Sequence, residues 1–181
     1  MFEEIAAEWG RLDFALHSIG YARAEDLHGR LIDCSAEGFA YAMQVSVHSF
    51  LRMARLAEPL MTSGGCLLAI TFYGAEKVVQ HYGVMGPVKA ALQTAVEYMA
   101  VELGDKLIRV NAISSGPVAT RSASGLNHFD ELLDRASRQA PEHRLITHDD
   151  VGALAAFLVS DEATAITGSV SYVDAGYHVV G

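Results

Sequence analysis

A phenol and an ammonium seven residues apart are the side chains of this sequence best suited to chemistry on a carbonyl. Tyr82 and Lys89 follow the apolar run at residues 66–72. On a continuous helix they share one face and lie about two turns, roughly 10 Å, apart. The phenol can donate a hydrogen bond to an oxygen that gains charge, and the cation can hold a hydroxylated ligand and stabilise the anion. Taken alone, this spacing is more typical of a half-buried aromatic residue and a solvated lysine.

The elements around this pair alternate between strands and helices. Residues 66–72 are apolar on both faces, as expected of a central parallel strand covered by helices. Apolar residues at three- and four-residue steps then predict a helix at 83–103, which Gly104 ends. Strands are predicted at 12–16, 108–113 and 169–173, and other helices at 2–9, 36–61 and 148–159. This order predicts an α/β fold with a parallel sheet and right-handed crossovers.

Local signals indicate where these elements begin and end. Gly10 closes the first helix, Ser35 caps the helix at 36–61, and residues 147–150 resemble a capping box. Residues 21–33 are predicted to form a loop, and residues 118–144 a polar, helix-prone insertion. The strand at 12–16 leads into the turn 17–20, and α/β proteins bring backbone to a ligand at the carboxyl ends of strands.

Composition narrows the functional classes. A chain of 181 residues fits a single domain over 1–181, and its 51% apolar share indicates a heavily buried protein or one with large subunit interfaces. A net charge of -9 disfavours nucleic acid and anionic lipid as partners. No apolar run reaches the ~20 residues of a membrane span, and the acidic start argues against a targeting segment. Cys34 and Cys66 are expected to be free thiols in a reducing cytoplasm, and the histidine spacing predicts no metal site.

Several motifs in order resemble the enoyl-acyl-carrier-protein reductases, a branch of the short-chain dehydrogenase/reductase family with six residues between the catalytic Tyr and Lys. They are Gly74-Ala-Glu-Lys77, Tyr82-Gly-Val-Met-Gly-Pro-Val-Lys89, Arg109-Val-Asn-Ala-Ile-Ser-Ser-Gly-Pro117 and Val173-Asp-Ala-Gly-Tyr-His-Val-Val-Gly181. The resemblance covers essentially the whole chain. It implies a Rossmann-like doubly wound parallel sheet that lacks its first strands and the phosphate-binding turn, because Met1 aligns with the helix before the fourth strand. The strand at 12–16 would then be an uncovered sheet edge.

The resemblance also implies an activity, namely reduction of trans-2-enoyl thioesters on acyl carrier protein with NADH in fatty-acid biosynthesis. Tyr82 matches the catalytic donor to the thioester oxygen, and Lys89 matches the residue that holds the nicotinamide ribose. The implied cofactor-binding residues are Ser18, Ile19, Gly20, Lys89, Gly116, Pro117, Val118 and Thr120. The implied substrate-binding residues are Tyr21, Phe72, Tyr82, Met85, Ala123, Leu126 and Phe129. The two long helices match the family's subunit contacts, so a cytoplasmic dimer or tetramer is expected.

Some positions depart from the family pattern. Phe72 stands where a second tyrosine is usual, and Arg121 replaces an aliphatic residue of the substrate lid. Asp130 and Glu131 stand where the lid helix usually offers cations to the acidic carrier protein. Neutral substitution of solvent-exposed residues explains these changes equally well. The alternatives are coenzyme A as the acyl carrier, a short-chain reductase with a different substrate, and a non-catalytic truncated relative that acts only as an assembly partner.

Overall fold

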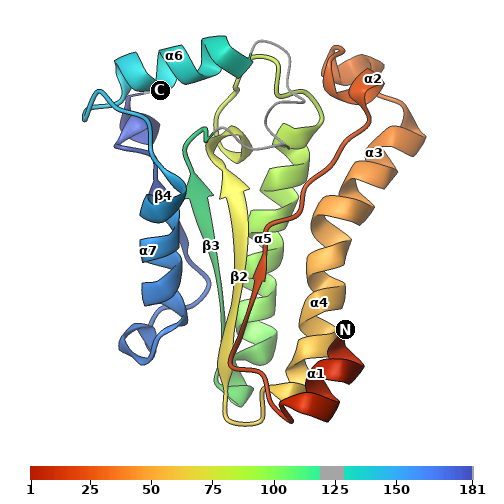
Figure 1. Cartoon of the computed structure of the whole chain (residues 1–181). Helices are drawn as coiled ribbons and strands as arrows, with labels where there is room; N and C mark the ends of the chain where they lie inside the picture. The colour runs from red at the N-terminus through yellow and green to blue at the C-terminus, as the bar shows by residue number, and fades with distance from the viewer. Residues whose placement is uncertain (119–128, 181) are drawn as a thin grey trace.

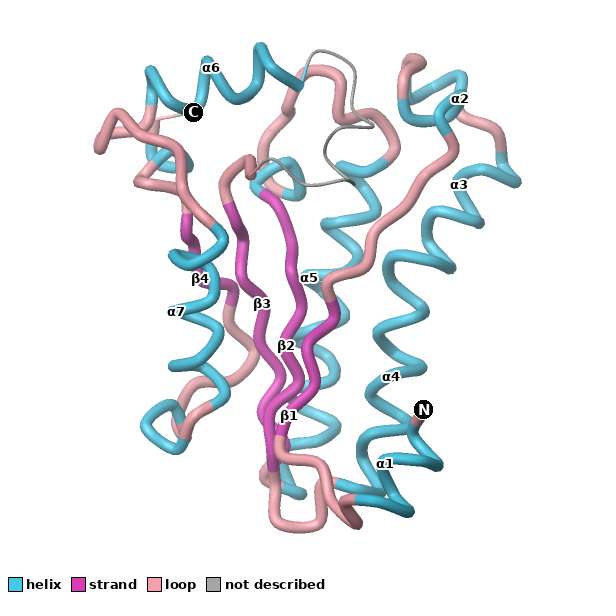
Figure 2. Tube along the Cα trace, in the orientation of Figure 1, coloured by secondary structure: helices cyan, strands magenta, loops and turns pink. Residues whose placement is uncertain are grey.

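The computed structural model describes residues 1–118 and 129–180, which form a parallel sheet with helices on both faces (Figure 1). In the described residues the four strands are adjacent in chain order, β1-β2-β3-β4, and every pairing is parallel. They are β1 (Phe14–His17), β2 (Gly65–Phe72), β3 (Ile108–Ser115) and β4 (Val170–Val173). The predicted α/β fold with a parallel sheet is confirmed. The carboxyl ends of all four strands therefore lie at one edge, and α2 and α6 lie beyond it (Figure 2).

Seven α-helices are described, and most of them match a predicted segment. They are α1 (Phe2–Glu8), α2 (Ala24–Leu27), α3 (Ala36–Met43), α4 (Ser49–Ala57), α5 (Met85–Leu103), α6 (Phe129–Gln139) and α7 (His148–Val159). Two predicted caps are confirmed: the Ser35 hydroxyl accepts the N–H of Gly38, and Thr147 forms a reciprocal capping box with Asp150. Within the described residues, no helix is both long and apolar enough to cross a membrane.

One face of the sheet is covered by α3, α4 and α5. Phe50 of α4 and Val88 of α5 are fully buried in the same cluster as Leu67 and Ala69 of β2. Burying side chains of this size contributes about 1.5–3 kcal/mol each, so this layer holds α5 firmly against β2. Since α5 carries Lys89, the main core also positions the candidate ammonium.

The other face is covered only in part. Leu158 of α7 packs on Leu68 of β2 and Ile113 of β3. Phe14 and Leu16 of the edge strand β1 point to the same side, because they pair in register with Cys66 and Leu68, yet they are 50% and 47% exposed. The predicted uncovered sheet edge is present, although the strand begins at Phe14 rather than at residue 12.

The predicted helix over 36–61 is present from Ala36 to Leu60, but it is not a regular α-helix. A π-helical turn at Gln44–His48 separates α3 from α4, and a 3₁₀ turn at Glu58–Leu60 follows α4. In the π turn the N–H of Ser49 bonds to the carbonyl of Gln44, five residues back instead of four. The apolar stripe continues through the one-residue insertion, so periodicity gave no sign of it.

The prediction of a loop over 21–33 was also incomplete. This segment contains α2 and a 3₁₀ turn at Leu31–Asp33. The buried carboxylate of Asp26 folds the segment back, because its Oδ1 accepts both the N–H and the hydroxyl of Ser35, at 2.9 and 3.0 Å. A negative charge at the N-terminus of α3 is favourable, and the contact ties α2 to that helix.

Candidate active site

Lys89 lies in the second turn of α5 and is 7% exposed. Its Nζ donates a hydrogen bond of 2.8 Å to the carbonyl of Ile70, near the carboxyl end of β2. Burial lowers the pKa of Lys89 to about 8, so the group is an ammonium at neutral pH. An ammonium has three N–H donors, and this carbonyl takes one of them. Lys89 can therefore offer further donors to a hydroxylated ligand.

The loop after β1 passes directly over Lys89. A Cβ placed on Gly20 would lie 3.6 Å from Lys89 Nζ and 3.6 Å from the terminal methyl of Met85. The structure thus brings Gly20, Met85 and Lys89 together, while Ser18 and Ile19 beside them are exposed. Exposed backbone next to a buried cation is suited to the ribose and amide groups of a bound nucleotide.

Tyr82 is 8% exposed and lies between Phe72 and the backbone of Gly74. The rings of Phe72 and Tyr82 are 4.8 Å apart between centroids, and a Cβ on Gly74 would lie 2.5 Å from the Tyr82 ring. Only glycine therefore allows the ring this position. Burial raises the pKa of the phenol, so it stays protonated and acts as a hydrogen-bond donor. Among the described residues the hydroxyl has no hydrogen-bond partner.

Tyr82 is not on the helix that carries Lys89, which corrects the predicted helix start at residue 83. Helix α5 begins at Met85, whose N–H closes a turn onto the Tyr82 carbonyl at 3.1 Å. Gly83 has a φ of +49°, which breaks the helical path before α5. The pair is brought together by β2 instead: Lys89 contacts Ile70, and Tyr82 packs on Phe72, two residues further along the same strand.

His17, the last residue of β1, is a buried histidine near Lys89. Its Nε2 lies 2.7 Å from Ser49 Oγ, and the Ser49 hydroxyl donates to the carbonyl of Val45 at 2.6 Å. A hydroxyl has one proton, so His17 must donate from Nε2, which leaves Nδ1 bare. Nδ1 is buried without a partner in the described structure. Burial, together with the charge of Lys89, lowers the pKa of His17 to about 4.

The turn after β3 reaches the same edge. Ser115 pairs with Phe72, so Gly116, Pro117 and Val118 follow directly beside the end of β2. A Cβ on Gly116 would lie 3.1 Å from the Cα of Asp174, so a larger residue there would press on the Asp174 backbone. The predicted residues Thr120, Ala123 and Leu126, and the departure at Arg121, lie outside the described residues.

Two predicted substrate residues make their contacts elsewhere. The Tyr21 ring packs edge-on against Tyr41 of α3, with 5.8 Å between centroids, and stays half exposed. Phe129 begins α6, whose buried residue Ala136 packs with Ala140, just beyond the helix, on Tyr73 and Tyr177. The described contacts thus place neither side chain against Tyr82.

Sequence reasoning did not assign a site role to several residues that shape this site. They are His17, Ser46, Ser49, Ile70, Gly74 and Gly83. A polar signal was available for Ser46, which stands within an otherwise apolar helical stripe. The carbonyl of Ile70 left no signal, because any residue type supplies one.

The described residues fit the nicotinamide end of a dinucleotide. They offer a buried ammonium, a protonated phenol and exposed loop backbone at the carboxyl edge of a parallel sheet, where α/β proteins bind ligands. Before residue 60 the sequence has no glycine-rich turn between a strand and a helix that could hold the pyrophosphate. The donor set therefore accounts for one half of such a cofactor.

Comparison with known proteins relates this site to one family. The family model described as Enoyl-(Acyl carrier protein) reductase matches residues 1–178. An enoyl-[acyl-carrier-protein] reductase [NADH] of Rhizobium meliloti is 45% identical over 181 residues, which are 100% of this chain and 66% of that protein. A Rickettsia typhi enoyl-[acyl-carrier-protein] reductase [NADH] is 42% identical, with 100% of this chain and 69% of that protein covered.

A solved structure gives the same relation. The enoyl-acyl-carrier-protein reductase of Anaplasma phagocytophilum, in complex with NAD, superposes with a TM-score of 0.95 and 49% identity. The superposition covers 100% of this chain and 69% of the Anaplasma chain. The chain thus spans about two thirds of the length of the relatives it matches.

Proposed function

Because the chain belongs to the enoyl-(acyl-carrier-protein) reductase family, we propose that it serves NADH-dependent reduction of trans-2-enoyl thioesters, with the acyl group on acyl carrier protein. The observation that carries this proposal is the pairing at the end of β2. A buried, protonated phenol packs on Phe72 and a buried ammonium bonds to the carbonyl of Ile70, two residues apart on one strand, with the 18–20 loop over the ammonium.

The proposed roles follow from these contacts. NADH, when bound, supplies the hydride for the β-carbon of the enoyl group. Tyr82 donates its hydrogen bond to the thioester oxygen, which gains charge as an enolate, and the α-carbon then takes a proton from solvent. Lys89 holds the ribose hydroxyls with the donors that Ile70 leaves available. A donor aimed at a developing oxyanion in a water-poor site lowers the activation barrier by about 2.7–4 kcal/mol.

Phe72 forms part of the wall of this site and does not supply a second hydrogen-bond donor. Its ring holds Tyr82 in place by a tilted contact but has no hydroxyl. We therefore assign the hydrogen bond to the thioester oxygen to Tyr82 alone. Gly20, Gly116, Pro117, Val118 and Met85 are proposed as neighbours of the bound nicotinamide and acyl groups, because they line the same edge.

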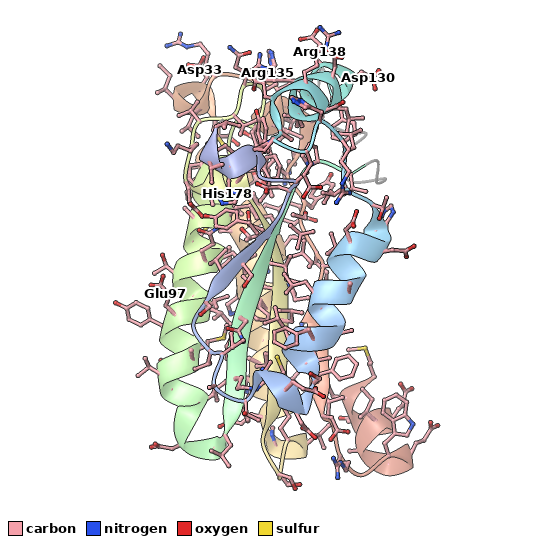
Figure 3. The ribbon with its side chains drawn as sticks, turned by 90° about the vertical axis from the view of Figure 1, so that its left-hand side faces the viewer. Asp33, Glu97, Asp130, Arg135, Arg138 and His178 are labelled. Carbon is pink, nitrogen blue, oxygen red and sulfur yellow. The ribbon has the colours of Figure 1, made fainter. Side chains whose placement is uncertain are left out.

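Helix α6 is proposed as the surface that meets the acyl carrier. It carries Asp130 near its start and Arg135 and Arg138 further along, and all three residues are exposed (Figure 3). The two arginines are cations that an acidic carrier could use, although Arg138 also pairs with Asp134 at 2.9 Å. Because α6 carries charges of both signs, acyl carrier protein and coenzyme A should both be tested as the acyl carrier.

The proposal includes assembly through α4 and α5. A groove of about 450 Å³ lies between these helices and is lined by Leu51, Ala54 and Tyr98, among others. Tyr98 and Val101 on the outer side of α5 are 69% and 84% exposed. Exposed apolar side chains on two adjacent helices support a subunit contact between copies of this chain.

The direct test is titration of the purified chain with NADH, followed by turnover of crotonyl thioesters on acyl carrier protein and on coenzyme A. We expect NADH to bind and the carrier-protein substrate to be reduced faster. Faster turnover of the coenzyme A substrate would change the assigned carrier. An absence of NADH binding at millimolar cofactor would refute a catalytic role for this polypeptide and favour a role in assembly.

A further inference from the structure

Two serines of the π-helical turn between α3 and α4 face the end of β1. Ser46 is fully buried within the turn, and Ser49 follows its last residue. A regular α-helix advances by about 100° for each residue, so a one-residue insertion turns the residues beyond it to a different side. The irregularity thus sets which residues of α4 meet the strand.

Ser46 binds the backbone of Tyr21 twice. The N–H of Tyr21 donates to Ser46 Oγ at 3.0 Å, and the hydroxyl donates back to the Tyr21 carbonyl at 3.3 Å. The one proton of the hydroxyl and one of its lone pairs are both used, so the two bonds are compatible. This residue fixes the far end of the loop that follows β1.

Ser49 fixes the near end of the same loop. Its Oγ accepts from Nε2 of His17 at 2.7 Å, because its own proton goes to the Val45 carbonyl. His17 is 1% exposed and packs on the ring of Phe50, with 5.2 Å between centroids. Only residues 18–20 lie between the two fixed positions. Gly20, at the end of this short span, lies directly over Lys89.

We propose that Ser46 and Ser49 are positioning residues for the 18–20 loop, holding it over Lys89 in the conformation that receives the nicotinamide ribose. The proposal rests on the proposed function for the identity of the ligand. The hydrogen bonds that hold the loop are within this chain and do not depend on which ligand binds. Both serines act through the loop and the histidine, so neither needs to touch the cofactor.

The first test is Ser46→Ala, which removes both bonds to Tyr21. We expect the Kd for NADH to rise about tenfold, while kcat at saturating NADH stays within about twofold, because Tyr82 is unaffected. The Tyr21 amide should exchange hydrogen at least about tenfold faster than in the wild type, measured by NMR without cofactor. Ser160→Ala is the matched control, since that hydroxyl bonds a backbone carbonyl at the end of α7.

A second variant covers the case in which Ser46→Ala is too unstable to measure. In Ser49→Ala the His17 ring loses its acceptor, so the imidazole ¹⁵N shifts should no longer report a single Nε2-protonated tautomer, and exchange at residues 18–20 should rise.

Unchanged amide exchange in both folded variants would overturn the proposal, and so would faster exchange with an unchanged Kd for NADH. If the wild type binds no NADH, the proposed function fails. The exchange data alone then decide whether the serines hold the loop.

Discussion

At the scale of single residues, burial decides the protonation state in which each group acts. Burial favours the uncharged form of both groups, because it raises the pKa of Tyr82 and lowers the pKa of Lys89. Tyr82 is therefore a neutral phenol, whereas Lys89 is still an ammonium. The phenol therefore serves as a hydrogen-bond donor at neutral pH rather than as a base. The ammonium keeps its charge because its pKa, at about 8, is still above neutrality.

Removal of the phenol hydroxyl should slow the chemical step selectively. In Tyr82→Phe we expect kcat for crotonyl thioester to fall about 10²–10³-fold, the cost of removing a donor to an oxyanion, with the Kd for NADH within about twofold. Steady-state kinetics and fluorescence titration measure the two quantities. Tyr98→Phe, on the exposed side of α5, is the matched control and should behave as the wild type. Unchanged turnover in Tyr82→Phe would show that the donor is misassigned.

NADH binding should depend on the charge of Lys89. Below its pKa of about 8 the group is an ammonium; above it the charge is lost, and the hydrogen bonds to the ribose weaken. We expect the Kd for NADH to be flat below about pH 7 and to rise above about pH 8, by up to about tenfold for each further unit. Lys77→Met, which alters an exposed lysine, should leave this profile unchanged, whereas Lys89→Met should bind weakly at every pH. A flat wild-type profile would contradict the proposed contact.

His17 should make the fold sensitive to acid. Its folded pKa of about 4 lies below the unfolded value of 6.5, so the unfolded chain binds the proton more readily between these values. Stability is therefore lost as the pH falls from about 6.5 to about 4, on the order of 3 kcal/mol for this group. Urea unfolding at several pH values should give a weaker dependence in His17→Gln. Equal acid sensitivity of the two proteins would mean that His17 titrates normally.

At the scale of elements, the segments that form the site are held in place by irregular backbone at their ends. The π turn receives the loop after β1, and the positive-φ residue Gly83 separates Tyr82 from α5. A Cβ on Gly83 would lie 2.5 Å from the Leu27 carbonyl, so α2 packs against the turn that carries Tyr82. These irregular turns set the geometry of the site together with α5, which the core holds against β2.

A pair of identical substitutions tests this view. Gly83→Ala should lower the free energy of unfolding by about 2 kcal/mol, because a left-handed φ is costly for alanine and its Cβ meets the Leu27 carbonyl. Turnover should fall as Tyr82 shifts. Gly152→Ala, in α7 with no atom within 4 Å of the new Cβ, should instead stabilise the protein by about 0.5–1 kcal/mol. Chemical denaturation measures both, and equal effects at the two sites would argue against a special role for Gly83.

At the scale of the whole molecule, the sheet is covered unevenly. One face is packed by α3, α4 and α5, while the β1 side of the other face stays open (Figure 1). The apolar residues on the outer side of α4 and α5 form a second exposed region. Both regions are surfaces where burial of apolar area would favour association.

The subunit contact proposed for α4 and α5 gives a prediction at this scale. Val101→Glu should shift the chain toward monomers in sedimentation experiments, since a charge in an apolar contact is costly to bury. Val78→Glu makes the same change at a fully exposed position near residue 82 and should leave assembly unchanged. If both variants sediment like the wild type, α5 does not form the contact.

The sequence by itself determined the α/β class, the main strands and helices and two helix caps, because apolar periodicity and capping residues act locally. The family followed from a different signal, the resemblance of several motifs in order. The sequence also singled out Tyr82 and Lys89. The shared-face argument assumed one continuous helix through both residues, whereas the structure has a turn before α5. Only the tertiary structure decided how the two residues meet, along β2, and which serines hold the loop above them. Those contacts join residues far apart in the chain, and they depend on a π turn and a positive-φ glycine that leave the apolar pattern unchanged.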